Sequence, residues 1–532
     1  MAQYQYQPFD YVPPAGLHTP EARHKIIIIG AGPIGLALAI DLAMRGIASV
    51  VLDDNNVVSV GSRAICWAKR TLEIFDRLGI GEKMVNKGVV WQIGRLFDGD
   101  DEVYHFDLLP EEGHKFPAFI NLQQYYVEEY LVERAKAFPD LIDLRFKNKV
   151  IDHQDKGDHI ALTIETPDGC YHLETDYLLA CDGASSPTRQ RMGLSFDGQT
   201  FNEQFLIADV EMQASPFETQ SAERWFWFNP PFHEGQSALL HQQPDNIYRI
   251  DLQLGPDADT AKEAEPSRVI SRIKQIMKDK PFTLDWMSIY KFSCARLDKF
   301  VHNRVIFVGD SAHIVSPFGA RGGNGGIHDV DNLGWKLAAI LKGSASASLL
   351  NSYDEERGIG ADENIANSAR ATNFMTPKSE IEMIFRNEVL RLANDKPFAR
   401  KLINSGRLSV PCSLMTSSLQ SHNKGLLTVG QAVLDAPLAN GQWLIDIIPS
   451  DFCLIAIGDI KAPEIEGLVR IGLAQNNPEY DCYQPQDNKV IERYGDGFLY
   501  LVRPDQHIAA AFASADPKAI INAYHIALGH KP

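Results

Sequence analysis

The pattern of hydrophobic and polar positions changes period several times along this chain. Near the start, four consecutive isoleucines, Ile26 to Ile29, form the continuous apolar run that is typical of a buried parallel strand. Positions 36–45 then follow a helical period that ends at Gly46, and a second apolar run covers 48–52. Strand, helix and strand in this order predict a βαβ unit.

The rest of the pattern predicts further helices and strands. Helical spacing predicts helices over 70–78, 121–137, 266–277, 326–341 and 349–371. Alternation predicts strands within 142–182, with a hairpin at Asp168-Gly169, and at 205–210, 224–228, 237–241 and 248–254. A short buried strand is expected at 305–308, and further strands at 444–448, 452–457, 468–471 and 498–502.

These elements predict several domains of the α/β class, because 532 residues exceed what one core holds. We expect an N-terminal arm at 1–24 and an antiparallel-sheet domain at 201–294. An α/β domain with a helical extension would combine 25–200 with 295–405. A C-terminal domain with its own sheet would cover 406–532.

A glycine pattern joins the first predicted strand to the first helix. Gly30, Gly32 and Gly35 form a complete G-x-G-x-x-G, with Pro33 inside it. In such a turn the first glycine permits the tight bend, the second lets a pyrophosphate approach the backbone, and the third lets helix pack on strand. Asp53 ends the second strand, 23 residues after Gly30, where a ribose-binding acid belongs. The pattern predicts a dinucleotide site, for FAD or NAD.

Two later motifs also place an acid where a predicted strand ends. The first runs into Asp182-Gly183 and carries Arg189 six residues after the glycine. The second ends at Gly309-Asp310 and continues into a glycine-rich loop over 319–326. The acids of these motifs could bind a ribose or ribitol hydroxyl, and the backbone N–H groups of the glycine-rich loop could donate hydrogen bonds to a ring.

Composition excludes several classes of function. A net charge of −18 argues against non-specific binding to nucleic acid or to an anionic membrane. No apolar run approaches the length of a bilayer span, and the polar start of the chain predicts no signal peptide. The seven cysteines are scattered without a C-x-x-C, so we expect no metal site, no redox dithiol and a cytoplasmic protein with reduced thiols.

The three motifs, in this order, resemble those of the single-component FAD-dependent aromatic hydroxylases, the class A flavoprotein monooxygenases. The resemblance covers about 24–400. It implies a Rossmann-like FAD-binding domain of the glutathione-reductase type beside a sheet domain for substrate. Segments 435–438 and 500–507 resemble the C-terminal thioredoxin-like domain, without a redox dithiol, of the members that hydroxylate phenol and 3-(3-hydroxyphenyl)propionate.

The resemblance assigns cofactor roles residue by residue. The FAD-binding set would be Gly30, Gly32, Pro33, Gly35, Asp53, Arg63, Gln123, Gln124, Asp182, Asp310, Arg321, Gly322, Gly323 and Asn324. Asp310 would bind the ribitol, and either Gln123 or Gln124 would contact the flavin. The loop 319–324 would lie under the flavin ring, with Pro317 over the pocket at its face. Ile65 stands where phenol hydroxylase has an acid, which argues against simple phenol as the substrate.

The activity implied is hydroxylation of a phenolic ring in aromatic catabolism by a cytoplasmic homodimer. NADPH or NADH would reduce the bound FAD, O2 would add to it, and the resulting flavin C4a-hydroperoxide would hydroxylate the ring. No second dinucleotide fingerprint occurs, which agrees with transient binding of NAD(P)H in this family.

Candidate substrate residues lie on the predicted sheet. Arg249 is a candidate for binding a carboxylate or orienting a phenol, although an ion pair within the sheet explains it equally well. His241 and Tyr290 are candidate bases, with structural roles as the alternative. His313 and the segment 503–507 are interpreted as structural, the latter alternatively as a subunit contact.

Three alternatives stay open. One is an FAD hydroxylase of a polycyclic secondary metabolite, and another is a non-catalytic FAD-binding protein or redox sensor. Loss of the Gly-Asp acid or of the glycine loop would favour the second, and neither is lost. The third is a flavin halogenase, whose lysine and W-x-W-x-I-P motif are absent from the sequence.

Overall fold

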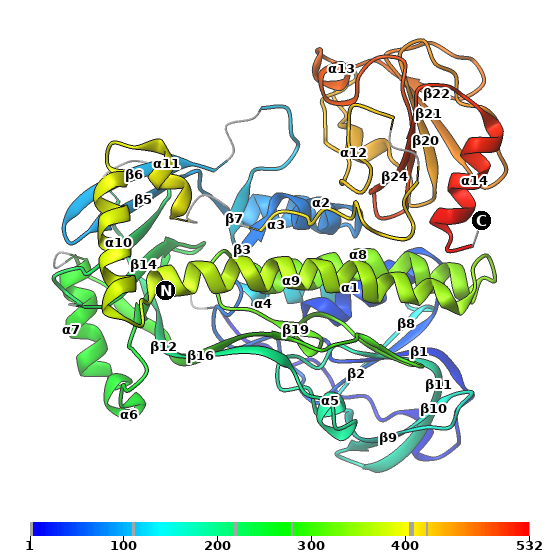
Figure 1. Ribbon diagram of the computed structural model, residues 1–532. Helices are drawn as coiled ribbons and strands as arrows, with labels where there is room; N and C mark the ends of the chain where they lie inside the picture. Colours follow the sequence, from blue (N-terminus) through cyan, green and yellow to red (C-terminus); the bar gives the residue numbers. More distant parts are fainter. Residues whose placement is uncertain are drawn as a thin grey trace.

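The computed structural model describes residues 4–108, 112–217, 221–233, 235–277, 280–403, 409–421 and 424–530. Two long helices, α8 (Gly322–Leu341) and α9 (Leu350–Met375), cross the middle of the molecule (Figure 1). A largely parallel sheet lies on one side of them, and an antiparallel sheet lies at one end. A five-stranded sheet near the C-terminus lies on the opposite side from the parallel sheet (Figure 1).

The parallel sheet is built around the isoleucine run. In it, β1 (His24–Ile29) pairs in parallel with β2 (Ser49–Asp53) and with β11 (Gly169–Ala180). The strand order is β17-β18-β11-β1-β2-β8, and β9 and β10 extend β11 as an antiparallel layer. The remaining strands are β8 (Ile142–Phe146), β9 (Lys149–Asp155), β10 (Ile160–Thr166), β17 (Val301–His302) and β18 (Val305–Phe307).

The helix after the glycine turn, α1 (Pro33–Met44), is buried along most of its length. It packs against α8 so closely that a Cβ on Gly334 would stand 1.8 Å from Asp41 Oδ2. The predicted helices at 70–78 and 121–137 are confirmed, and the helix that we predicted from residue 326 begins four residues earlier. The other helices here are α2 (Lys69–Arg77), α3 (Gly81–Lys87), α4 (Gln124–Ala135) and α5 (Pro187–Arg191).

The antiparallel sheet has the order β19-β16-β12-β15-β14-β13-β5-β6. It reaches beyond the predicted range of 201–294, because β5 and β6 come from an earlier segment and β5 pairs in parallel with β13. The strands are β5 (Ile93–Asp98), β6 (Asp101–Asp107), β12 (Asp197–Glu211), β13 (Glu223–Phe228), β14 (Ser237–Gln242), β15 (Ile247–Gln253), β16 (Thr283–Arg296) and β19 (His313–Ile314). Helices α6 (Thr260–Glu263) and α7 (Pro266–Ile276) follow β15.

The two faces of this sheet have different partners. On one face, side chains such as Leu240 and Ile250 form a core with Val269 and Ile273 of α7. The other face, which includes Phe205, packs towards the end of α9 and towards α10 (Glu380–Ala393) and α11 (Pro397–Leu402). Alternation along each strand separates the two sets, because successive side chains point to opposite faces.

The C-terminal part has a sheet of its own, as we predicted, with the order β22-β21-β20-β23-β24 and a separate hydrophobic core. Its elements are β20 (Cys453–Ile457), β21 (Val469–Leu473), β22 (Asp481–Tyr483), β23 (Leu499–Val502), β24 (Ile508–Phe512), α13 (Lys489–Tyr494) and α14 (Pro517–Ala527). The strand that we predicted at 444–448 is wrong, because Leu444–Ile447 forms one helical turn, α12. The predicted boundary at 405–406 lies outside the described residues.

A buried ionic network joins this C-terminal part to the long helices. The guanidinium of Arg503 is fully buried and donates to both carboxylate oxygens of Glu356 on α9, at 2.5 and 2.9 Å, and it also pairs with Asp505. Lys336 of α8 donates to the same Glu356 at 2.7 Å. The segment 503–507 is therefore an internal structural contact rather than a catalytic one.

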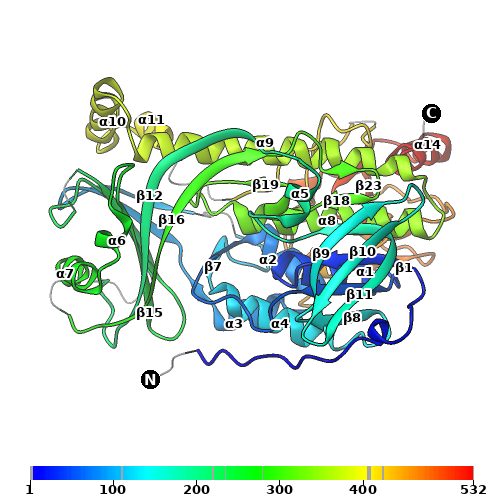
Figure 2. The same ribbon diagram turned by 90° about the horizontal axis from the view of Figure 1, so that it is seen from below.

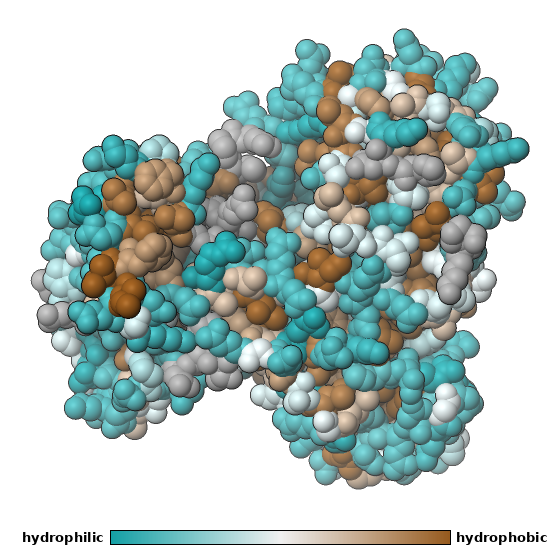
Figure 3. Space-filling view, in the orientation of Figure 1, coloured by the Kyte–Doolittle hydropathy of each residue, from teal (hydrophilic) through white to brown (hydrophobic). Residues whose placement is uncertain are grey.

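The surface carries two further features. The N-terminal segment runs along the outside of the molecule to a short 3-10 helix, Ala15–Leu17 (Figure 2). Apolar side chains gather over α10, where Ile381, Ile384 and Phe385 are each more than half exposed (Figure 3). None of the described helices combines the length and the apolar character of a membrane span.

Candidate flavin and substrate site

The three glycines of the first turn meet different surroundings. A Cβ on Gly30, whose φ is +104°, would stand 2.5 Å from the carbonyl oxygen of Cys181, and one on Gly35 would stand 2.0 Å from the carbonyl oxygen of Gly30. A Cβ on Gly32 would meet nothing within 4 Å. The fold itself therefore requires Gly30 and Gly35. Gly32 opens a space beside the N-terminus of α1, where Pro33 is the first residue, and an anionic ligand can approach there.

Asp53 connects the second strand to this turn. Its carboxylate accepts hydrogen bonds from the backbone N–H of Ala31 at 2.6 Å and of Asn55 at 2.8 Å. Burial raises the pKa of Asp53 to about 6, against the effect of these two donors. The acid thus stands beside the glycine turn, as a dinucleotide site needs.

The three predicted flavin contacts between residues 63 and 124 differ in how their side chains are held. Gln124 is held by three hydrogen bonds, from Ala64 N–H at 3.2 Å and to Ser59 Oγ and Glu128 Oε1 at 2.9 and 2.7 Å. Gln123 is buried, and its Oε1 has no hydrogen-bond partner among the described residues. The side chain of Arg63 is exposed.

The Asp-Gly and Gly-Asp motifs are tied to each other. Asp182 accepts from the N–H of Thr188 at 3.0 Å through Oδ2, while its buried Oδ1 lacks a partner within the described part of the chain. Arg189 donates to the carbonyl oxygen of Ser311 at 3.0 Å, and so links the first motif to the loop that carries Asp310. Asp310 is exposed, yet the protein around it desolvates it enough to raise its pKa.

A buried carboxylate fixes that loop from behind. Asp329 of α8 accepts from the N–H of Gly309 at 3.0 Å, from His313 Nε2 at 2.7 Å and from Arg357 Nε at 2.6 Å. Burial alone would raise the pKa of Asp329, but His313 and Arg357 together lower it to about 2. His313 has the structural role that we predicted.

The glycine loop leads into the N-terminus of α8. Arg321 is buried, whereas Gly322 and Gly323, which open the helix, are partly accessible. Asn324 anchors the loop, because its Oδ1 accepts from the N–H of Ala68 and its Nδ2 donates to the carbonyl oxygen of Cys66, both at 2.9 Å. Free N–H groups at this helix start can face a polarised ring.

A small hollow lies between the antiparallel sheet and this loop. Its lining residues are Phe205, Ile207, Arg224, Leu239, Asp251, Phe292, Pro317 and Phe318. Six of the eight are apolar, which suits a ring, and Arg224 and Asp251 supply opposite charges. Pro317 lies in the wall that continues directly into the glycine loop.

The candidate substrate residues share one row of the sheet. Register places His241 opposite Arg249, and Arg224 opposite His241. Arg249 donates from Nε to Asp251 Oδ1 and from Nη1 to the carbonyl oxygen of Arg63, both at 2.7 Å. Burial, together with the two arginines, puts the pKa of His241 well below its usual value. Tyr290 lies on β16, half-buried and outside the lining of the hollow.

Sequence reasoning missed Arg224. Arg224 begins the predicted strand 224–228, in which Phe226 and Phe228 lie on the hollow's side of the sheet while Trp227 packs with the α7 core. The alternation of that strand was the available signal, because it places Arg224 on the same face as Phe226.

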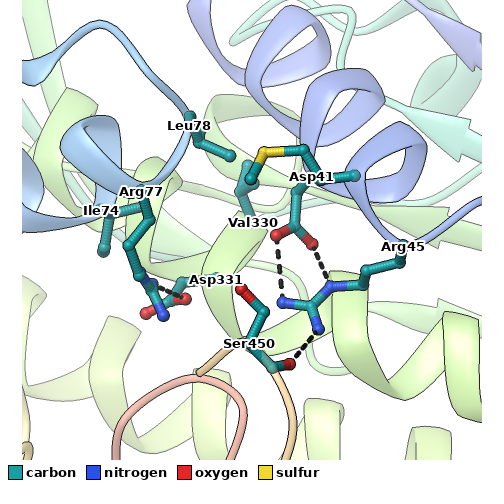
Figure 4. Close-up of a pocket in the computed structure, with 9 residues that line it drawn as sticks. Asp41, Arg45, Ile74, Arg77, Leu78, Val330, Asp331 and Ser450 are labelled. Atoms are coloured by element: carbon teal, nitrogen blue, oxygen red, sulfur yellow. Dashed lines mark hydrogen bonds and ion pairs between the residues drawn. The ribbon is translucent and has the colours of Figure 1, made fainter. Parts of the chain in front are cut away.

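A second hollow, of about 350 Å³, lies where α1, α2 and α8 meet the loop before β20 (Figure 4). Arg45 donates there to Asp41 at 3.0 Å and to the carbonyl oxygen of Ser450 at 2.9 Å, and Arg77 pairs with Asp331 (Figure 4). None of its lining residues belongs to the predicted FAD set. It is a polar seam between the parallel-sheet domain and the C-terminal part.

The parallel sheet, the glycine turn and the Gly-Asp loop define a dinucleotide-binding flavoprotein. The open space at Gly32, the accessible carboxylate of Asp310 and the Oδ1 of Asp182, which has no partner among the described residues, all fit a bound FAD. The FAD binding domain family matches residues 23–368. The chain belongs to this family and is an FAD-dependent monooxygenase of the class A aromatic hydroxylases.

Similar proteins span nearly the whole chain. A flavin-dependent monooxygenase of Mycobacteroides abscessus is 28% identical over 512 residues, which cover 91% of this chain and 96% of that protein. A 3-(3-hydroxy-phenyl)propionate/3-hydroxycinnamic acid hydroxylase of Klebsiella pneumoniae is 25% identical, with 94% and 93% covered. The fold is similar to that of the flavin-dependent monooxygenase PieE in complex with FAD and substrate. That match has a TM-score of 0.81 and 19% identity, and it covers 96% of this chain and 100% of that one.

Proposed function

We propose that this enzyme hydroxylates a phenolic ring in aromatic catabolism, using FAD, O2 and either NADPH or NADH. The observation that carries the proposal is the position of the hollow. One wall is the apolar sheet face, and the other contains Pro317 and runs on into the glycine loop. The family places this loop at the flavin ring, so a substrate ring in the hollow would lie beside the cofactor.

The residues that would hold FAD are those whose surroundings fit it. Gly32 and Asp53 would bind the ADP half, Asp310 the ribitol, and the start of α8 the flavin ring. FAD bound there would supply the redox chemistry, with two electrons from reduced nicotinamide, one oxygen atom of O2 going to the ring and the other leaving as water. Arg189 ties the Asp-Gly motif to the loop that carries Asp310, and Asp182 is fixed within its own motif by the N–H of Thr188.

The chain's own side chains position the ring and exclude water. Phe205, Leu239 and Phe292 line the hollow with apolar surface. Arg249 positions Asp251 through their ion pair, and His241 Nε2 lies 3.7 Å from Asp251 Oδ2. Burial and the two neighbouring arginines hold the pKa of His241 well below its usual value, so His241 stays neutral beside this ion pair.

The test is anaerobic reduction of the bound flavin by NADH and by NADPH, with a panel of phenols, hydroxylated aromatic acids and polycyclic phenols. We expect one nicotinamide to be preferred and one ring class to accelerate reduction, followed by a hydroxylated product when O2 is admitted. Acceleration by polycyclic compounds alone would favour hydroxylation of a polycyclic secondary metabolite. A yellow protein that neither nicotinamide reduces, with or without any ring, would favour a non-catalytic FAD-binding role.

Three further assignments accompany this proposal. We infer a thioredoxin-like fold for the C-terminal domain, because parallel β20 and β21 are followed by antiparallel β23 and β24 and a closing helix, α14. The homodimer stays a prediction, for which light scattering of the purified protein is the measurement. The cytoplasmic location also stays a prediction, and cell fractionation tests it.

A further inference from the structure

Arg224 is the charged group in the substrate hollow that the reaction outlined above leaves unused. Its side chain is 3% exposed, and its Nε and Nη1 have no hydrogen-bond partner among the described residues. No described carboxylate lies within ion-pair distance of it, whereas the neighbouring Arg249 is paired with Asp251 at 2.7 Å. A buried guanidinium without an anion is rare, because removing a charge from water is costly.

Aromatic contacts compensate only part of that cost. The guanidinium carbon of Arg224 lies 4.7 Å from the centre of the Phe226 ring and 5.6 Å from that of Trp91. Such contacts stabilise a cation modestly and satisfy none of its N–H donors. Burial accordingly lowers the pKa of Arg224, a sign that the surroundings do not fully support its charge. The site is therefore electrostatically incomplete without a ligand.

The position of Arg224 shows where that ligand would be. Arg224 lines the same hollow as Pro317 and Phe292, and so faces the space that a substrate ring would fill. Asp251 lines it from two strands away, roughly 10 Å across the sheet. An anion is favoured at the Arg224 end, whereas Asp251, already paired with Arg249, offers carboxylate oxygens that can accept from a hydroxyl, so the two residues give the hollow a direction.

We propose that Arg224 binds a carboxylate on the substrate, which makes the substrate a hydroxylated aromatic acid. This rests on the proposed function of the same hollow. Planar guanidinium groups bind carboxylates through two parallel hydrogen bonds, so a carboxylate would supply the missing counter-charge and accept from at least one of the two unpartnered N–H groups. The polar hydroxyl end of the ring then points towards Asp251. Arg224 thus sets both the substrate class and the orientation of the ring.

Binding by the intact flavin-loaded enzyme tests this without turnover. The probes are 4-hydroxybenzoate, 3-hydroxybenzoate and 3-(3-hydroxyphenyl)propionate, each compared with its primary amide, and binding is followed by the change in flavin absorbance or by calorimetry. At least one acid should bind the wild-type enzyme roughly ten- to a hundredfold more tightly than its amide, as expected for a charge-assisted pair. Equal or weaker binding of every acid would overturn the proposal whether or not any variant folds.

Variants then assign the preference to one residue. Arg224→Met should abolish the preference for the acid while changing amide binding little, and Arg224→Lys should restore part of it. The matched control is Arg386→Met. Arg386 is also buried beside a ring, 5.8 Å from the centre of Phe228, but it donates to the amide oxygens of Asn229 and Asn387 and does not line the hollow. The preference should survive in the control.

Two results separate this proposal from its rivals. If Arg224→Met instead loses its discrimination between a phenol and the matching methyl ether, the arginine binds a phenolate and the carboxylate assignment is wrong. If an acid binds with the expected preference but no ring accelerates flavin reduction, the anion site stands and the hydroxylase proposal fails.

Discussion

Replacing Gly32 by alanine separates what the fold needs from what the cofactor needs. Gly32 has φ −74° and ψ −177°, which alanine adopts without strain, and a Cβ there would meet nothing within 4 Å. Gly35 is its matched control in the same turn. There a Cβ would stand 2.0 Å from the carbonyl oxygen of Gly30, so helix and strand would have to separate.

The magnitudes follow from these surroundings. At Gly32, alanine gains about 0.4–1 kcal/mol by restricting the unfolded chain and loses a similar amount as a poorer N-cap. The free energy of unfolding of the apoprotein should therefore stay within about 0.5 kcal/mol of wild type. FAD binding should weaken by roughly ten- to a hundredfold, because the methyl group displaces a phosphate from backbone N–H donors. Gly35→Ala should cost the apoprotein about 1–3 kcal/mol.

The assay has two readouts for each variant. Denaturant unfolding of the apoprotein gives stability, and quenching of flavin fluorescence on titration gives FAD affinity. Wild-type FAD affinity in Gly32→Ala would show that no ligand approaches this backbone, which would refute the cofactor placement. A loss of apoprotein stability as large as that of Gly35→Ala would show that the fold itself needs Gly32.

The other predictions concern the remaining anchors. Asp310→Ala should purify without FAD, because the ribitol loses its acceptor; full flavin occupancy would contradict the Gly-Asp assignment. The pKa of Asp329 is depressed from 3.8 to about 2, so its carboxylate stabilises the fold above pH 3.8 by about 2 kcal/mol, and this contribution is lost as the pH falls towards 2. The free energy of unfolding should therefore fall less with decreasing pH in Asp329→Asn than in the wild type. Asp329→Asn should also be about 3–5 kcal/mol less stable at neutral pH, because Arg357 loses its partner. The same dependence of the unfolding free energy on acidic pH in both proteins would refute this. Arg503→Met should destabilise the protein by about 3–5 kcal/mol, because Glu356 would keep only Lys336 as a cationic partner. Thermal unfolding at the wild-type temperature would show that this buried ionic network is dispensable for stability.

The sequence by itself determined the parts whose geometry is local. The isoleucine run, the glycine spacing and the acid at the end of β2 predict the βαβ unit and its dinucleotide site, because each depends on residues within one strand–turn–helix segment. The run at 444–448 shows the limit of such reasoning. Its apolar residues fit either a short strand or a single helical turn. The tertiary structure, not the local pattern, selects the helical turn.

Tertiary structure decided what the charged residues do. Arg224, His241 and Arg249 come from three strands, and only the sheet register places them in one row. Nothing near Arg249 in the sequence shows that it has a partner in Asp251 and in the carbonyl of Arg63, or that Arg224 has no ion-pair partner among the described residues. The role of a buried charge depends on the groups that surround it in space, and distant segments of the chain supply those groups.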